Sequence, residues 1–223
     1  MLRKISTFVL SSLLVLSFSV PAFASNEPVD TTRNSTLSDL KQVIQNLNEV
    51  YGEKTTITIN ESDLSEEYLQ SLSAYNNEEL VDYLTGFYED AANIEYKVVD
   101  VKTVPAEPGM ITPFYTTYLN RECTIYSGIP SGGVSWIHIR YNALIGDSND
   151  GPYDGLFYGG RVLDSWQTGT AVASWKHQLG NFQPYGNQAD VTATGLLTYG
   201  IPNTPLSVTT QQTFLYTDSI QNY

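Results

Sequence analysis

Cysteine and histidine are scarce in this chain. Its 223 residues contain one cysteine, Cys123, and two histidines, His138 and His177. A lone cysteine excludes an intramolecular disulfide, so the fold must be stabilised by packing or by bound ions. The chain also lacks the His-Glu-x-x-His pattern of zinc proteases and the Gly-x-Ser-x-Gly elbow of serine hydrolases. These absences favour a function without catalysis.

Basic residues are also few. The chain has 11 lysines and arginines against 24 aspartates and glutamates, which gives a net charge of −13. No cluster of basic residues is present to neutralise phosphates, and this argues against nucleic acid or an anionic membrane surface as a partner. Residues 25–104 hold 16 acidic and 5 basic residues, compared with 8 and 4 in residues 105–223. We expect a soluble protein, with bound cations or a basic partner as alternatives.

Long hydrophobic runs are absent except near the N-terminus. Arg3 and Lys4 precede that run, and Ala22 and Ala24 follow it at the spacing that a signal peptidase recognises. The run is shorter than the ~20 apolar residues of a membrane-spanning helix. Residues 1–24 are therefore expected to be a cleaved signal peptide. The short basic start and the lack of cysteine pairs indicate secretion by a Gram-positive bacterium, with no membrane span in the mature protein.

Proline and glycine divide the rest of the chain into two units. Residues 105–113 contain three prolines and a glycine, which interrupt both helices and strands, and are expected to form a linker. Residues 25–34 are expected to be a flexible leader, and residues 35–104 a small acidic α+β unit. Its helices are predicted near residues 36–51 and 77–91, and its strands near 55–60 and 94–104. Asn76 and Glu79 predict a capping box at the second helix.

Residues 114–223 are different in pattern. No long window has a helical period, and apolar residues alternate with polar ones, as at Ile137, Ile139 and Tyr141. Turn-forming sequence, such as Gly180-Asn181, separates the alternating runs. The region therefore predicts an all-β antiparallel sandwich or small barrel of about seven strands. The expected strands are 114–119, 122–126, 134–145, 156–166, 171–179, 189–201 and 206–216.

A Ser-Trp-x-His motif occurs twice and includes both histidines. The copies are Ser135–His138 and Ser174–His177. On a strand, residues two apart point to the same face, so Trp136 lies with His138 and Trp175 with His177. Three interpretations remain open: a duplicated structural hairpin, a pair of aromatic platforms for a sugar or cell-wall glycan, and a two-histidine metal site. The candidate binding residues are Trp136, His138, Trp175 and His177.

One acidic loop is a candidate calcium site. Asp147, Asn149, Asp150 and Asp154 offer oxygen ligands, of which Ca²⁺ takes six to eight. The loop departs from the EF-hand spacing, and Asp-Gly is also a common tight-turn pair, so a simple turn is the alternative. Calcium is the only cofactor that the sequence suggests.

Cys123 lies in an alternating strand pattern rather than at the start of a helix, where its pKa would be lowered. A nucleophile–base pair with His177 can be drawn, with Asn181 or Asp190 to orient the base. The setting favours a buried, unreactive thiol instead.

Three functions are compatible with these observations. The first is a secreted, non-catalytic β-domain protein that binds an extracellular or cell-envelope ligand, such as a cell-wall polymer or glycan. The second is an exported antibacterial effector in which residues 25–109 form a removable pro-region. Residues 173–177, with Ala189 and Val191, resemble small β-sandwich bacteriocins of the lactococcin type, although the second histidine of such a motif is missing. The third is a hydrolase that uses carboxylates such as Asp147, Asp150, Asp154 or Asp164.

Overall fold

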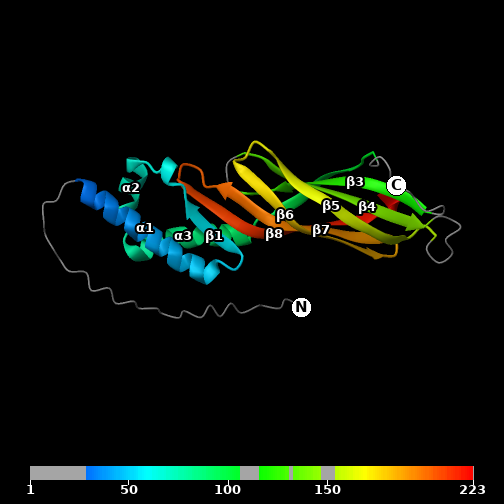
Figure 1. The fold of residues 1–223 in the computed structure, drawn as a ribbon, viewed down its shortest axis with the longest axis horizontal. Helices are drawn as coiled ribbons and strands as arrows, with labels where there is room; N and C mark the ends of the chain where they lie inside the picture. The colour runs from blue at the N-terminus through cyan, green and yellow to red at the C-terminus, as the bar shows by residue number, and fades with distance from the viewer. Residues whose placement is uncertain (1–28, 106–115, 131–132, 147–153, 223) are drawn as a thin grey trace, which may run out of the picture.

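The computed structural model describes residues 29–105, 116–130, 133–146 and 154–222. A short helical unit is followed by two antiparallel sheets of four strands each, which pack as an open sandwich rather than a closed barrel (Figure 1). The predicted fold class is confirmed. The strands are β1 (Thr55–Ile59), β2 (Tyr96–Thr103), β3 (Thr116–Ser127), β4 (Ser135–Gly146), β5 (Phe157–Gly169), β6 (Ala173–Tyr185), β7 (Gln188–Gly200) and β8 (Leu206–Ser219). Their orders are β1-β8-β7-β6 and β2-β3-β4-β5.

Three helices lie at one end of the long sandwich: α1 (Val29–Tyr51), α2 (Glu66–Leu72) and α3 (Asn77–Ala92) (Figure 1). The capping box of α3 is confirmed, because the Asn76 side chain accepts from the backbone N–H of Glu79 at 3.0 Å and the Glu79 carboxylate accepts from the N–H of Asn76 at 2.9 Å. Helix α1 begins before the predicted residue 36, since no proline or glycine interrupts residues 29–51.

The helices bury one apolar face against the sandwich. Leu40, Ile44 and Leu47 have the three- and four-residue spacing of one helical face, and all are buried. Helix α1 contacts β1, and α3 contacts both β1 and β8. Gln212 on β8 donates through Nε2 to the carbonyl of Ala91 at the end of α3, at 2.8 Å. Helices and sheets therefore share one hydrophobic core.

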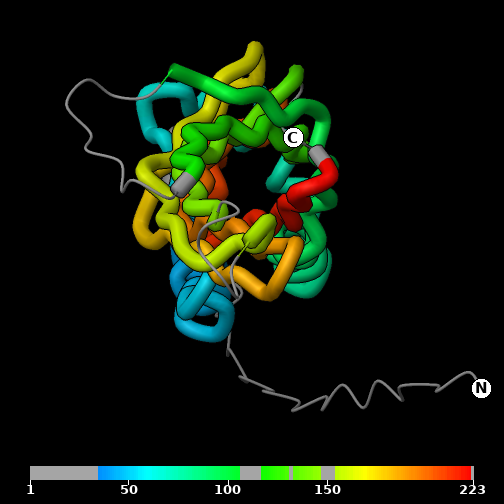
Figure 2. Tube along the Cα trace, turned by 90° about the vertical axis from the view of Figure 1, so that its right-hand side faces the viewer, coloured from blue at the N-terminus to red at the C-terminus, as the bar shows by residue number. Residues whose placement is uncertain are grey.

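Alternating side chains fill the space between the sheets. Every second residue of β7 from Ala189 to Tyr199 is buried, as the period of two predicts. In the end-on view of Figure 2 the strands of the two sheets surround the interior that these side chains fill. Completely or almost completely buried members of this core are Ile125, Ile137, Ile139, Tyr141, Val191, Leu197, Tyr199, Val208 and Phe214.

The prediction of two strands at 114–119 and 122–126 is wrong, because β3 is continuous. The two residues between the predicted strands, Asn120 and Arg121, are buried inside it. Arg121 Nη1 lies 3.0 Å from Oδ1 of Asp218 on β8, and this buried ion pair joins the two sheets. Tyr141 and Tyr216 donate to the same carboxylate at 2.8 and 3.0 Å. A buried charge is tolerated because it is paired and hydrogen-bonded.

The predicted turn at Gly180-Asn181 is also wrong, because both residues lie within β6. Any side chain at position 180 would collide with Val162 of β5. Glycine is therefore present here so that β6 can approach β5 closely, not because the chain turns.

The strands predicted in the first unit pair with strands of the second. β1 pairs with β8, from Thr55 opposite Thr210 to Ile59 opposite Leu206. β2 pairs with β3, from Tyr96 opposite Ser127 to Thr103 opposite Arg121. Each sheet thus takes an edge strand from the N-terminal part of the chain. The expected linker, residues 105–113, lies outside the described residues except for Pro105.

None of the helices in the described ranges combines the length and the apolar character that crossing a membrane requires. The predicted signal peptide lies outside the described residues.

Candidate functional site

The outward surface of the β2-β3-β4-β5 sheet carries a continuous set of charged and aromatic side chains. Because residues opposite one another on antiparallel strands share a face, the strand registers place these side chains in three rows. We call this surface the outer face. Its rows are Tyr126, Trp136 and Thr168; Thr124, His138 and Trp166; and Lys102, Glu122, Arg140 and Asp164.

Glu122 lies at the centre of the charged row. Its side chain is only 7% exposed, and it contacts three cationic or potentially cationic groups. Oε1 lies 3.0 Å from Lys102 Nζ and 3.4 Å from His138 Nδ1, and Oε2 lies 3.5 Å from Arg140 Nη2. The three partners come from β2 and β4, on either side of β3, so the carboxylate fixes their positions relative to one another.

The charges around Glu122 decide its protonation state. Burial alone would raise the pKa of this carboxyl group, but Lys102, His138 and Arg140 oppose burial and hold the pKa below its usual value of 4.5. Glu122 is therefore ionised at neutral pH. A carboxyl group with a lowered pKa does not suit the role of a general acid.

Trp166 is packed against two residues of β4. The His138 ring is stacked nearly parallel to the indole, with centroids 5.2 Å apart, and the Arg140 guanidinium lies 5.1 Å from the ring centroid. His138 also hydrogen-bonds through Nε2 to Thr168 Oγ1 at 2.7 Å and through Nδ1 to Thr124 Oγ1 at 3.2 Å. These contacts orient the imidazole and the guanidinium before any ligand arrives.

The row of Tyr126, Trp136 and Thr168 lies beside these residues, and its two aromatic rings have fewer polar and ring contacts within the protein. Tyr126 on β3 stands opposite Trp136 on β4, and Tyr126 is 39% exposed. Within the described ranges, the half-buried Trp136 indole makes no hydrogen bond and no ring contact. This row therefore offers a ligand two rings, the indole of Trp136 from the first copy of the motif and the phenol of Tyr126 from the neighbouring strand.

The second copy of the motif lies elsewhere. Trp175 on β6 packs edge-to-face on the buried Phe214 at 5.4 Å and donates through Nε1 to Ser165 Oγ at 2.7 Å. His177 Nδ1 bonds the same hydroxyl at 2.6 Å. Ser165 is buried on β5, and its neighbour Trp166 points to the outer face. Because successive residues of a strand point to opposite faces, the two motif copies lie on opposite sides of β5.

The structure therefore separates the four candidate binding residues into two pairs. Trp136 and His138 lie on the outer face, and Trp175 and His177 lie at the seam between the sheets. Among the residues with described positions, no three His, Cys, Asp or Glu side chains are grouped so that they could hold a metal ion.

Only Asp154 of the four candidate calcium ligands lies in the described residues. Asp147, Asn149 and Asp150 lie outside the described residues, and Asp154 is exposed and forms an isolated bridge with Gly146. The calcium site stays a prediction.

Cys123 lies completely buried in β3, opposite Val101 and Ile139. Burial, the largest cause, raises the pKa of its thiol to about 12, so the thiolate needed by a nucleophile is strongly disfavoured. His177 is bonded to Ser165 rather than to this thiol.

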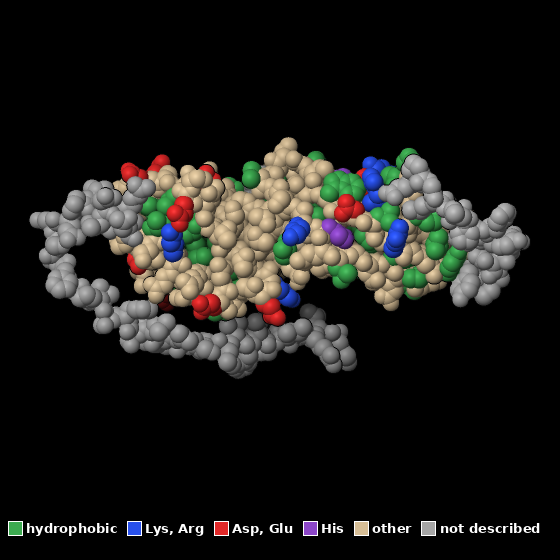
Figure 3. All heavy atoms as spheres, in the orientation of Figure 1, with side chains coloured by type: hydrophobic (Ala, Val, Ile, Leu, Met, Phe, Trp, Pro, Cys, Tyr) green, Lys and Arg blue, Asp and Glu red, His purple; other side chains and the backbone are tan. Residues whose placement is uncertain are grey.

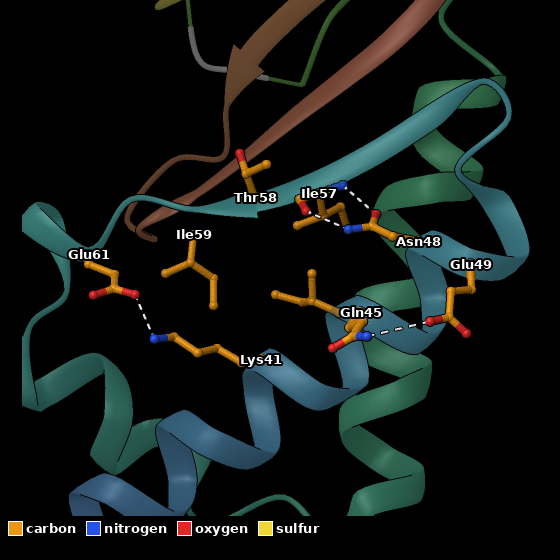
Figure 4. A pocket seen from close by; sticks show the side chains of 9 residues that line it. Lys41, Gln45, Asn48, Glu49, Ile57, Thr58, Ile59 and Glu61 are labelled. Atoms are coloured by element: carbon orange, nitrogen blue, oxygen red, sulfur yellow. Dashed lines mark hydrogen bonds and ion pairs between the residues drawn. The ribbon is translucent and has the colours of Figure 1, made fainter.

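A separate groove of about 530 Å³ lies between α1 and β1 (Figure 4). Ile44, Ile57 and Ile59 give it an apolar wall, and the ion pair of Lys41 Nζ with Glu61 Oε1, at 2.6 Å, lies at one end. A groove of this volume is within the usual range for small-ligand sites. Several of its polar side chains are already engaged, since Lys41 pairs with Glu61 and Gln45 donates to Glu49.

Asn48 gives this groove a structural role. Its side-chain amide donates to the carbonyl of Ile57 and accepts from the N–H of Ile57, both at 2.9 Å (Figure 4). The amide thus replaces the backbone of a missing neighbouring strand at the edge of β1. Tyr88 fixes Asn48 by donating to its Oδ1 at 2.7 Å. Covered edges of this kind protect a sheet from pairing with other chains.

Sequence reasoning missed the charged row of the outer face. Lys102, Glu122, Arg140 and Asp164 are far apart in the chain, and only the strand registers bring them together. One signal was present: alternation around Cys123 and Ile125 places Glu122, Thr124 and Tyr126 on the opposite face of their strand.

No protein family, curated protein or solved structure matches this chain.

Proposed function

We propose that this chain is a secreted, non-catalytic protein that binds an extracellular or cell-envelope ligand on the outer face of its β2-β3-β4-β5 sheet, with a glycan as the ligand class. The observation that carries the proposal is the half-buried Trp136 beside the exposed Tyr126, next to a row of preoriented polar groups. Aromatic rings pack on the apolar faces of sugars, and neighbouring polar groups bind the hydroxyls.

Several features support binding rather than catalysis at this surface. Glu122 is held ionised by three neighbours, and His138 has both ring nitrogens engaged. Groups fixed in this way can position a ligand, but they are not poised to exchange protons with it. The proposal assigns Trp175 and His177 a structural role at the seam.

The test is binding by the purified mature protein to a panel of neutral and charged glycans and to isolated cell walls. We expect Trp136→Ala to weaken binding at least tenfold and to lower the free energy of unfolding by less than about 1 kcal/mol, because this indole makes no hydrogen bond or ring contact with the described residues. Tyr185→Ala is the control, since Tyr185 is an exposed aromatic residue on β6, in the other sheet.

Unchanged binding by the Trp136 variant, or an equal loss in the Tyr185 variant, would show that the outer face is not the site. A failure of the wild-type protein to bind any member of the panel would contradict the glycan assignment. Secretion is tested by the N-terminus of the extracellular form, which we expect to be Ser25.

The same experiment addresses the effector alternative. Removal of residues 25–109 would take β1 and β2 away from β8 and β3 and leave both sheets with new edges. We therefore expect the extracellular protein to retain these residues. An N-terminus near residue 110, together with growth inhibition by the fragment, would favour the effector instead.

A further inference from the structure

We propose that the ligand of the outer face is an anionic polysaccharide, and that its carboxylate groups bind between Lys102 and Arg140. This inference rests on the proposed function and specifies the chemical class of its ligand.

The distribution of charge is the first argument. Acidic side chains in view gather mostly over the helical end, and basic and histidine side chains over the sandwich (Figure 3). Among the residues with described positions, strand register places on the outer face four of nine basic residues but only three of 20 acidic ones. They are Lys97, Lys102, Arg140 and Arg161 against Asp100, Glu122 and Asp164. This face is therefore the part of an acidic protein that repels an anion least.

The arrangement around Glu122 is the second argument. Lys102 and Arg140 are 53% and 41% exposed, whereas the carboxylate between them is 7% exposed. Glu122 binds Lys102 through one oxygen and Arg140 through the other, so both cations are held above a buried counter-charge. An arginine has five N–H donors, and the contact with Glu122 leaves others for a second carboxylate.

The stacked Trp166 adds to this preorganisation. The Arg140 guanidinium lies over the indole, which limits its rotation and lowers the entropy that is lost when a ligand binds. A planar guanidinium fixed in this way is suited to a planar carboxylate.

The spacing of the rows indicates a polymer rather than a single sugar. Trp136 and Arg140 are four residues apart on β4, which corresponds to about 13 Å along the strand. One sugar ring cannot reach both residues. A chain of several sugars can stack on Trp136 with one unit and present a carboxylate to Arg140 with another.

The experiment compares two forms of one polymer with the full mature protein. Polygalacturonate and its fully methyl-esterified form have the same backbone, and only the first carries charged carboxylates. We expect polygalacturonate to bind at least tenfold more tightly than the ester, and this preference to fall as salt is added. Arg140→Gln should remove most of the preference. Arg140→Lys should retain part of the preference, because lysine keeps the positive charge but lacks the paired N–H donors of the guanidinium. Lys176→Gln, which removes the same charge from an exposed residue of β6, is the control and should retain the full preference.

The outcomes separate this inference from the function on which it rests. Equal binding of both polymers, or binding of neutral glycans alone that depends on Trp136, would overturn the anionic ligand and leave the proposed function intact. Failure to bind any glycan would overturn both. Because Arg140 is partly exposed, its variants are expected to fold, and a thermal melt of each verifies this before binding is measured.

Discussion

The two copies of Ser-Trp-x-His have the same residues but opposite environments. In the first copy Trp136 and His138 face outward, and Ser135 and Ile137 are buried. In the second copy Trp175 and His177 face the seam, while Ser174 and Lys176 are exposed. The strands carry the motif in opposite phase, and a shift of one residue moves every side chain to the other face.

The residue at the variable position sets this phase. Isoleucine gains free energy by burial, so Ile137 points into the core and sends its neighbours outward. A lysine has a large penalty for burial, so Lys176 points to solvent and its neighbours turn inward. A repeated motif therefore does not imply a repeated role, and the apolar or polar character of the residue inside the motif distinguishes the two roles.

Exchanging the residues at the variable position is the most direct test of whether they set the orientation of each motif copy. Ile137→Lys places a charge at a completely buried position, and we expect a loss of more than about 4 kcal/mol or failure to fold. Lys176→Ile should change the free energy of unfolding by less than about 0.5 kcal/mol. Urea denaturation measures both. If the lysine variant does not fold, Ile137→Ala is measured in its place, and we expect it to lower the free energy of unfolding by about 2–4 kcal/mol.

The two tryptophans give the next largest difference. Trp175→Ala removes the packing on Phe214 and the hydrogen bond to Ser165, so we expect a loss of about 2–3 kcal/mol. Trp136→Ala should lose less than about 1 kcal/mol. Equal losses in denaturant titrations would mean that both copies are structural.

Ser165 distinguishes the two copies further, because its hydroxyl bonds Trp175 and His177 of the second copy. Ser165→Ala leaves the Trp175 Nε1–H and the His177 ring without their shared partner, at a cost of about 1–2 kcal/mol. Ligand binding at the outer face should not change. A variant that loses affinity but not stability would show that the seam contributes to the site.

The smallest expected effect concerns the carboxylate beside the first copy. Because the folded protein holds the pKa of Glu122 below 4.5, its contribution to stability is present above that pH and is lost as the pH falls below it. Glu122→Gln should therefore cost about 1 kcal/mol at pH 7 and much less at pH 3. Unfolding titrations of both proteins at the two pH values measure the difference. A constant difference would indicate that Glu122 acts through its shape and not its charge.

Local pattern predicted much of the fold. The α3 cap, the buried face of α1 and the alternation of β7 all follow from residues close together in the chain. The errors occurred where distant partners decide the outcome. The predicted strands stop on either side of Arg121, whose partner Asp218 is 97 residues away, and the predicted turn falls on Gly180, whose close neighbour Val162 lies on another strand.

The candidate site was less predictable than the fold for the same reason. Trp136 and His138 could be selected from their motif, but the role of Glu122 depends on Lys102 and Arg140, which only the register reveals. Outward-facing residues have no hydrophobic period of their own. The sequence therefore shows which face they occupy but not which neighbours they meet.

The pairing of β1 with β8 has a consequence for the timing of synthesis. Thr55 meets Thr210, its partner 155 residues later in the chain. At about 5–20 residues per second, a ribosome makes β1 roughly 8–30 s before its partner strand exists. The sheet cannot close during most of translation, and contacts of such long sequence separation also form slowly afterwards. Until then, one edge of β1 is protected from pairing with strands of other chains by the two hydrogen bonds between Asn48 and the backbone of Ile57. Both residues belong to the N-terminal part of the chain, so this protection does not depend on β8.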